Sequence, residues 1–203
     1  MNVTKDWNGN TKSIFVTHGA SNHSEDERAE RDYYATDPEA VKKLLEREKF
    51  HHYVLEPCCG DGHISRVLEE AGYNVESWDI VQRSYEKQRG TRDFLTFSPS
   101  PRNDKDIVTN PPYNVAAEFV THALEHSMES VKVAMFLKLT FLEGAKRKKL
   151  FDYYPPKRIY VFGNRIDCWK NGIKPQKPSK AVCYAWFVWE KGFCGDTIIQ
   201  RID

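Results

Sequence analysis

Apolar and polar positions between residues 33 and 190 follow two periods, one typical of buried strands and one of amphipathic helices. The predicted strands are Tyr53–Glu56, Tyr73–Ile80, Asp106–Thr109, Val131–Leu139, Arg158–Phe162 and Ala181–Trp189. The predicted helices run from about Pro38 to Lys49, from His63 to Ala71 and from Val115 to Met128, and a basic helix starts at Glu143 and ends near Asp152. The predicted strand Val131–Leu139 is apolar apart from Lys132 and Lys138, which suits a central parallel strand, so the pattern favours βαβ units.

The first predicted helix has a defined start. Thr36 or Asp37 is a good N-cap, and Pro38 suits the first helical turn. Free N–H groups at such a start could hold a carboxylate, although a plain capped helix explains the same residues equally well.

A glycine turn follows the strand Tyr53–Glu56. Gly60 and Gly62 permit positive φ and let a ligand approach the backbone, and a helix begins directly after them. The next predicted strand ends in Asp79, nineteen residues after Gly60. In βαβ nucleoside sites an acid at this position accepts hydrogen bonds from the ribose hydroxyls. Packing glycines are common, but turn, helix, strand and acid together favour a nucleoside site.

Asn110, Pro111, Pro112 and Tyr113 follow the strand Asp106–Thr109. The prolines lack N–H groups and hold the residues before them extended, so this loop is stiff and presents carbonyl acceptors. An exocyclic amine suits it, because the Asn110 side-chain oxygen and the Pro111 carbonyl can accept both N–H groups while the Tyr113 ring covers the attached flat group. An ordinary turn is the alternative interpretation, since Asn and Pro are turn formers.

Charge is distributed unevenly along the 203 residues. The net charge is +1, but residues 146–180 contain eleven Lys and Arg against two acids, which gives +9 there and −8 elsewhere. Such a basic face suggests a polyanionic partner, although a charge run is often only a solvated surface. The candidate nucleic-acid contacts are Lys146, Arg147 and Lys149 in the basic helix and Arg165, Trp169 and Lys170 in the loop Gly163–Lys180, because Trp can stack on a base while cations meet phosphates.

Composition predicts a polar arm over residues 1–31 and a single domain over residues 32–203, with 40% hydrophobic residues to form its core. The five cysteines are odd in number and include no Cys-x-x-Cys pair, so we expect reduced thiols, a cytoplasmic protein and no metal site. The longest apolar run, Ala181–Trp189, is too short to span a membrane.

Three motifs occur in order: Tyr34-Ala35-Thr36-Asp37-Pro38, Glu56-Pro57-Cys58-Cys59-Gly60-Asp61-Gly62 and Asn110-Pro111-Pro112-Tyr113. With them the chain resembles the class I S-adenosylmethionine-dependent methyltransferases, and more narrowly the adenine-specific DNA methyltransferases of phage and prophage genomes. The resemblance implies a doubly wound α/β fold with a mostly parallel seven-stranded sheet and an antiparallel C-terminal strand pair. Restriction-associated relatives carry a separate target-recognition domain, for which the ninety residues after Tyr113 leave little room.

The same resemblance implies S-adenosylmethionine as the cofactor. Thr36 and the start of its helix would hold the methionine carboxylate, Asp79 the ribose, and Asp93 with Phe94 the adenine. The residues expected around the cofactor are Tyr34, Thr36, Glu56, Pro57, Gly60, Gly62, Asp79, Ile80, Asp93, Phe94 and Asn110.

The implied reaction is methyl transfer to the exocyclic N6 amine of adenine in DNA, by direct in-line displacement on a flipped-out base. The catalytic group would be Asn110, Pro111, Pro112 and Tyr113. Similar loops also serve enzymes that methylate RNA base amines or a protein glutamine amide, and a catalytically inactive nucleic-acid-binding module is a third possibility. The +9 segment favours nucleic acid over protein, and the intact motifs favour an enzyme.

Overall fold

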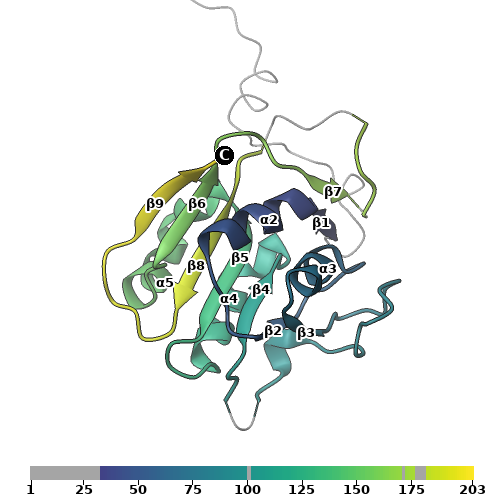
Figure 1. Cartoon of the computed structure of the whole chain (residues 1–203). Helices are drawn as coiled ribbons and strands as arrows, with labels where there is room; N and C mark the ends of the chain where they lie inside the picture. Colours follow the sequence, from purple (N-terminus) through teal and green to yellow (C-terminus); the bar gives the residue numbers. More distant parts are fainter. Residues whose placement is uncertain (1–32, 100–101, 171, 177–181) are drawn as a thin grey trace, which may run out of the picture.

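The computed structural model describes residues 33–99, 102–170, 172–176 and 182–203; the arm expected over residues 1–31 lies outside them. These residues form a seven-stranded sheet and a separate two-stranded sheet. Across the large sheet the strands are β3 (Asn74–Ser77), β2 (Tyr53–Glu56), β4 (Asp106–Thr109), β5 (Lys132–Lys138), β8 (Tyr184–Glu190), β6 (Arg158–Phe162) and β9 (Ile198–Ile202) (Figure 1). The small sheet pairs β1 (Tyr34–Thr36) with β7 (Cys168–Lys170).

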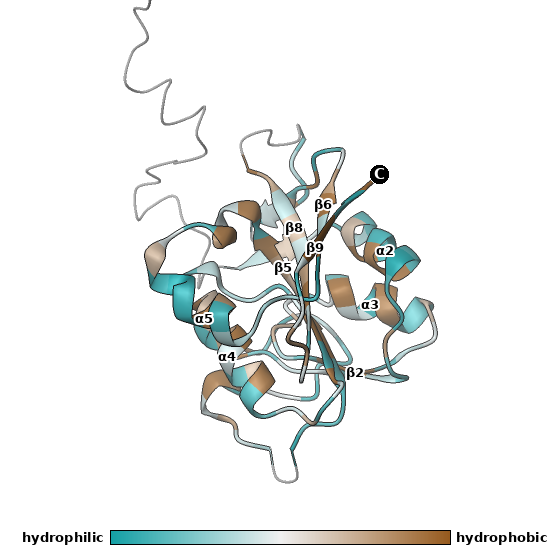
Figure 2. Ribbon diagram, turned by 90° about the vertical axis from the view of Figure 1, so that its left-hand side faces the viewer, coloured by the Kyte–Doolittle hydropathy of each residue, from teal (hydrophilic) through white to brown (hydrophobic). Residues whose placement is uncertain are grey.

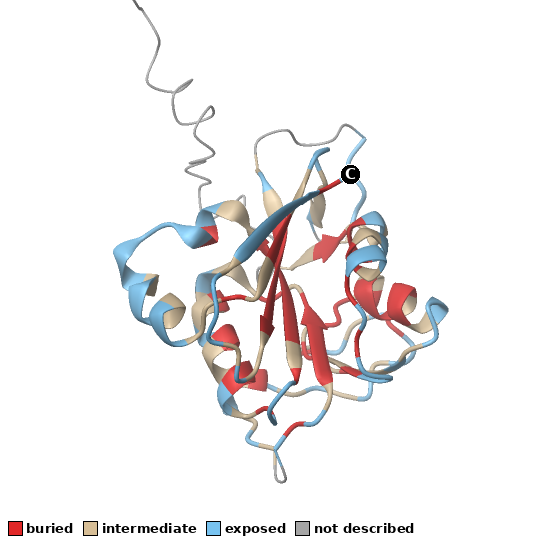
Figure 3. Cartoon of the chain, turned by 60° about the vertical axis from the view of Figure 1, so that its left-hand side comes forward, coloured by how far each residue is buried: buried red, intermediate tan, exposed pale blue. Residues whose placement is uncertain are grey.

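Four of the six pairings in the large sheet are parallel, and β8 runs antiparallel to both β5 and β6. This confirms the mostly parallel seven-stranded sheet and its antiparallel C-terminal pair. The edge strand β9 was not predicted. Four of its five residues are exposed, so it lacks the alternation that marks a half-buried strand (Figure 3).

Helices cover both faces of the large sheet (Figure 2). Helices α2 (Pro38–Arg47) and α3 (His63–Glu70) pack on one face, and α4 (Ala116–Glu125) and α5 (Lys148–Tyr153) pack on the other. Neighbouring residues of β4 are therefore buried on opposite faces of the sheet: Ile107 packs toward α4, and Val108 packs toward α2 and α3. Burial on both faces explains the continuous apolar strands. None of the described helices is long and apolar enough to cross a membrane.

Several predicted boundaries were wrong. Helix α2 ends at Arg47 rather than Lys49, and α4 is shorter than 115–128 because residues 127 and 128 turn back against Asn103. Strand β3 ends at Ser77, so Asp79 lies beyond it in an isolated bridge with Thr91. The basic helix does not include Glu143; it is a 3-10 turn, η6 (Ala145–Arg147), followed by α5. Part of the loop predicted over 163–180 is strand β7.

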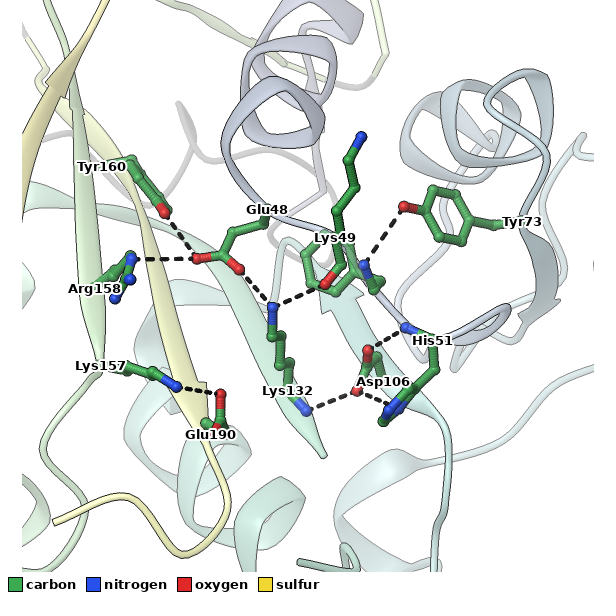
Figure 4. A network of polar contacts seen from close by, with 11 residues as sticks. Glu48, Lys49, His51, Tyr73, Asp106, Lys132, Lys157, Arg158, Tyr160 and Glu190 are labelled. Atoms are coloured by element: carbon green, nitrogen blue, oxygen red, sulfur yellow. Dashed lines mark hydrogen bonds and ion pairs between the residues drawn. The ribbon is translucent and has the colours of Figure 1, made fainter. Parts of the chain in front are cut away.

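Buried polar contacts tie the amino ends of the central strands to the end of α2 (Figure 4). Asp106 accepts the backbone N–H groups of His51 at 2.6 Å and Lys132 at 2.7 Å. Glu48 accepts Lys132 Nζ and the Tyr160 hydroxyl, each at 2.7 Å. These contacts stabilise the end of the sheet where the central parallel strands begin. The glycine turn and the Asn110 loop lie at the other end, because both follow carboxyl ends of parallel strands.

Candidate active site

A cavity lies at the carboxyl ends of β2, β3 and β4, where ligands bind in open α/β sheets. It brings together motifs that are far apart in the sequence. Residues predicted for the site that line it are Tyr34, Thr36, Glu56, Pro57, Asp79, Ile80, Asp93, Phe94, Asn110, Pro111, Pro112 and Tyr113.

Gly60 and Gly62, which were predicted to lie beside the cofactor, are not among the residues that line this cavity. Both have positive φ, +52° and +82°, which favours glycine. A Cβ on Gly60 would lie 2.4 Å from the Tyr33 ring, and one on Gly62 would lie 2.4 Å from the Tyr85 ring. The glycines therefore shape the turn and admit two aromatic rings, while the cavity wall at this point comes from Cys58 and Cys59.

The two cysteines of this turn are free, as are the other three. Burial raises the pKa of both Cys58 and Cys59 well above the ordinary thiol value. Both therefore stay protonated at neutral pH and supply packing, not a thiolate nucleophile.

Asp79 connects the end of β3 to the glycine turn. Its Oδ2 accepts the Gly60 N–H at 2.8 Å, and its Oδ1 accepts the Val81 N–H at 3.0 Å. A carboxylate can accept about four hydrogen bonds. Asp79 thus keeps acceptor capacity toward the cavity that it lines.

Glu56 ends β2 and is 1% exposed. Its Oε2 accepts the Ser65 hydroxyl, and Ser65 Oγ lies 2.6 Å from Ser77 Oγ. Burial raises the pKa of Glu56 well above its ordinary value, which the hydrogen bond from Ser65 only partly opposes. The side chain carries a carboxyl group whose charged form is disfavoured until a cationic ligand approaches.

Three residues that line the cavity each have a buried polar atom with no hydrogen-bond partner among the described residues: Thr36 Oγ1, His63 Nδ1 and Arg83 Nε. Buried polar groups are normally satisfied, so each orphan marks a place where a ligand can bond. Burial also lowers the pKa of His63, which favours the neutral imidazole. Sequence reasoning missed His63; its position as the first helical residue after the glycine turn was the available signal.

Phe94 begins a 3-10 helix, η3 (Phe94–Thr96). Asp93 caps it by accepting the Leu95 N–H at 3.0 Å. The Phe94 ring packs on Phe119 and His122, at centroid distances of 5.1 and 4.9 Å. Phe94 is therefore both a core residue and part of the cavity wall.

The Asn110 side chain is oriented by a contact with β1. Its Nδ2 donates to the Tyr34 carbonyl at 2.8 Å and lies 3.8 Å from Cys168 Sγ. Within the described part of the chain, no donor bonds Asn110 Oδ1 or the Pro111 carbonyl. The loop therefore has two acceptors without a donor among the described residues.

Tyr113 is held on several sides. Its hydroxyl lies 3.2 Å from Cys168 Sγ, and its ring packs against Tyr34 at 6.2 Å and Tyr184 at 6.0 Å between centroids. Burial raises the pKa of Tyr113 well above its ordinary value, so the phenol stays neutral. The ring has a fixed orientation before any ligand arrives.

The contacts that Asn110 and Tyr113 make with Tyr34 and Cys168 depend on the small sheet of β1 and β7, which was not predicted. Thr36 lies opposite Cys168, and Ala35 lies opposite Trp169. The Trp169 ring makes an edge contact with His63 at 5.3 Å, and Lys174 Nζ lies 5.4 Å from the same ring. The sheet thus places Trp169 against His63, which lines the cavity, and Lys174 lies beside Trp169.

The remaining candidates for nucleic-acid contact differ in availability. Lys146 and Lys149 are exposed beside α4. Arg147 instead donates to the carbonyls of Phe141 at 2.7 Å, Thr140 at 3.2 Å and Glu143, and its guanidinium lies over the Phe141 ring. Arg165 Nη1 lies 2.6 Å from Cys183 Sγ. The three hydrogen bonds from Arg147 to backbone carbonyls stabilise the turn after β5, so its guanidinium is already engaged.

No protein-family model and no curated protein sequence matches this chain. Solved structures share its fold. A predicted O-methyltransferase from Agrobacterium tumefaciens matches with a TM-score of 0.59 at 12% identity, over 81% of this chain and 85% of that one. A Listeria monocytogenes protein assigned to the class I S-adenosylmethionine-dependent methyltransferases matches with a TM-score of 0.53 at 10% identity, over 81% of this chain. A type I restriction modification subunit assigned in Vibrio vulnificus matches with a TM-score of 0.54 at 15% identity, over 83% of this chain.

The chain spans 62% of the Listeria protein and 47% of the Vibrio subunit. At these identities the likeness concerns the fold. The seven-stranded sheet with helices on both faces is therefore the Rossmann-like fold of the class I methyltransferases.

Proposed function

We propose that this chain, which has the fold of the class I S-adenosylmethionine-dependent methyltransferases, transfers a methyl group from S-adenosylmethionine to the N6 amine of adenine in DNA. The observation that carries the proposal is the pair of acceptors at Asn110 Oδ1 and the Pro111 carbonyl. The Asn110 NH₂ group is already bound by the Tyr34 carbonyl at 2.8 Å, so its oxygen is left for a donor. A planar primary amine has the two N–H groups that this pair can accept.

The cavity residues fit the cofactor. The orphaned Thr36 Oγ1 and His63 Nδ1 offer hydrogen bonds to its amino acid part, beside the N-terminal ends of α2 and α3. Asp79 offers carboxylate oxygens to the ribose hydroxyls, and Ile80 with Phe94 offers apolar surface to the adenine. When bound, the cofactor supplies an activated methyl group on a positively charged sulfur.

Catalysis by the chain's own residues would be alignment and electrostatics. Asn110 Oδ1 and the Pro111 carbonyl hold both amine hydrogens, which turns the nitrogen lone pair toward the methyl carbon. As positive charge grows on the amine nitrogen during methyl transfer, both acceptors would bind its N–H groups more strongly. The displaced amine proton then leaves to solvent. No covalent enzyme intermediate is required.

The target adenine must leave the duplex to reach this loop, at a cost of a few kcal/mol. The fixed Tyr113 ring offers a stacking surface that offsets part of this cost. Its orientation by Tyr34, Tyr184 and Cys168 reduces the entropy lost when a base binds.

Nucleic acid is favoured over a protein glutamine amide by the cations near the site. Trp169 packs against His63 of the cavity lining with Lys174 beside it, and Lys146 and Lys149 are exposed beside α4. Stacking groups and cations together suit a polynucleotide, and a protein substrate does not require them. DNA is proposed over RNA because of the three motifs in this order.

The test is methylation with a radiolabelled cofactor against duplex DNA, single-stranded DNA, RNA and protein, followed by nucleoside analysis. The expected product is N6-methyladenine in DNA, absent when Asn110→Ala replaces the wild type. Label confined to RNA or to protein would refute the DNA proposal and identify the alternative substrate.

A further inference from the structure

Lys138 is the last residue of β5 and lies beside the Asn110 loop. In the register of the parallel pair, Thr109 lies opposite Met135, so the loop after Thr109 runs alongside the end of β5. On the other side Lys138 lies opposite Tyr184 in β8. Its Nζ lies 5.1 Å from the centroid of the Tyr113 ring.

The charge of Lys138 is not balanced within the described part of the chain, where no carboxylate lies within 4.0 Å of its Nζ. The lysine at the other end of the same strand differs, since Lys132 Nζ lies 2.7 Å from Glu48 (Figure 4). Lys138 is half-buried among aromatic rings and directed at the ring of the catalytic loop. An ammonium in such surroundings is stabilised by an anion that arrives with a ligand.

From this placement we infer that Lys138 binds a backbone phosphate next to the target nucleotide. The inference rests on the proposed function. A base stacked on Tyr113 brings its two flanking phosphodiesters to the rim of the loop, within reach of the flexible lysine side chain. A glutamine side chain brings no such anion, so Lys138 would also select nucleotides over protein amides.

The test replaces each phosphodiester flanking the target adenine, one at a time, with a neutral methylphosphonate. Wild-type protein, Lys138→Met and Lys138→Arg are compared on an oligonucleotide that the wild type methylates. One replacement should lower kcat/KM of the wild type about tenfold, within the usual coupling range for contacting groups. The same replacement should change Lys138→Met by less than about twofold, because the interaction is already missing. Lys138→Arg should keep the wild-type sensitivity.

Lys191→Met is the matched control. Its Nζ lies 5.7 Å from the centroid of the Tyr154 ring, so it makes a similar cation–ring contact. Lys191 follows the end of β8, which pairs with the start of β5 and so lies at the opposite end of the strands from Lys138. This variant should respond to methylphosphonates as the wild type does. Lys138→Gln provides a second neutral side chain if Lys138→Met does not fold.

The outcomes separate the two proposals. If Lys138→Met loses as much as the wild type at both methylphosphonates, the phosphate contact is wrong while methylation of DNA stands. If the wild type methylates no adenine in DNA, the proposed function fails and the phosphate contact fails with it.

Discussion

The Tyr113 hydroxyl lies 3.2 Å from Cys168 Sγ, although 55 residues separate them in the sequence. The same sulfur lies 3.8 Å from Asn110 Nδ2. One thiol on β7 therefore touches both functional side chains of the loop after β4. Burial raises the pKa of Cys168 to about 12, so the contact involves a neutral thiol.

Cys168→Ala should lower the methylation rate by up to about tenfold, because a hydrogen bond contributes about 1 kcal/mol to holding these side chains. Cofactor affinity should stay unchanged, since the thiol does not line the cavity. Cys168→Ser should recover part of the rate through its hydroxyl. Single-turnover kinetics with calorimetric cofactor titration would measure both quantities.

The exposed Cys194 provides the control for that experiment. Cys194→Ala should leave the rate unchanged. Equal rate losses in Cys168→Ser and Cys168→Ala, with lowered unfolding temperatures in both, would make the contact structural only.

Sequence reasoning succeeded where chemistry is local. The Asn110–Tyr113 loop and the glycine turn are each set by neighbouring residues, so their conformation follows from proline and glycine stereochemistry. The contacts made by β7 could not be predicted, because a three-residue strand pairs with β1 only when the sheet is complete. The role of Arg147 could not be predicted either, because the carbonyls to which it donates belong to a turn that no sequence pattern indicated.

Thr36→Val tests the cofactor assignment. The change removes a buried hydroxyl that has no partner, so the free energy of unfolding without ligand should rise by about 1 kcal/mol. Affinity for S-adenosylmethionine should fall about tenfold if that hydroxyl bonds the cofactor. Denaturant unfolding and calorimetry would follow these opposite effects.

Thr109→Val is the matched control, because Thr109 Oγ1 is also buried, has only the Cys58 thiol as a polar neighbour among the described residues and does not line the cavity. It should leave cofactor affinity unchanged. Unchanged affinity in Thr36→Val as well would remove Thr36 from the cofactor site.

Glu56→Gln should change how stability depends on pH. The pKa of Glu56 is raised in the folded state above its ordinary value of 4.5. Above about pH 4.5 the unfolded chain releases a proton that the folded chain retains, so Glu56 makes folding less favourable as pH rises toward the folded pKa. Glu56→Gln removes this titration, and its stability relative to the wild type should increase from pH 5 to pH 8.

Denaturant unfolding across that pH range would measure the difference. The exposed Glu46 on α2 is the control, and Glu46→Gln should give no such trend. A constant difference between Glu56→Gln and the wild type at all pH values would show that Glu56 ionises normally in the folded protein.

Lys146→Ala and Lys149→Ala should each weaken DNA binding and flatten its salt dependence. The slope of log K against log salt should change by about 0.9 for each phosphate that the protein no longer neutralises. Arg147→Ala should instead lower the unfolding temperature, because Arg147 is engaged with three backbone carbonyls. Fluorescence anisotropy at several salt concentrations would separate these effects. Unaltered slopes in both lysine variants would leave these side chains as solvated surface.

Asn110→Ala is the change on which the enzyme proposal depends. It should lower the methylation rate by about 10² or more, comparable to the loss of one preorganised group at a site of developing charge. Cofactor affinity should stay within a few fold, because the Asn110 oxygen acts mainly on the amine as it becomes cationic. Asn110→Asp should retain some activity, since a carboxylate oxygen also accepts, although it loses the bond to the Tyr34 carbonyl. A wild-type rate in Asn110→Ala, measured as N6-methyladenine formed per enzyme, would mean that the loop is an ordinary turn and that the amine is bound elsewhere.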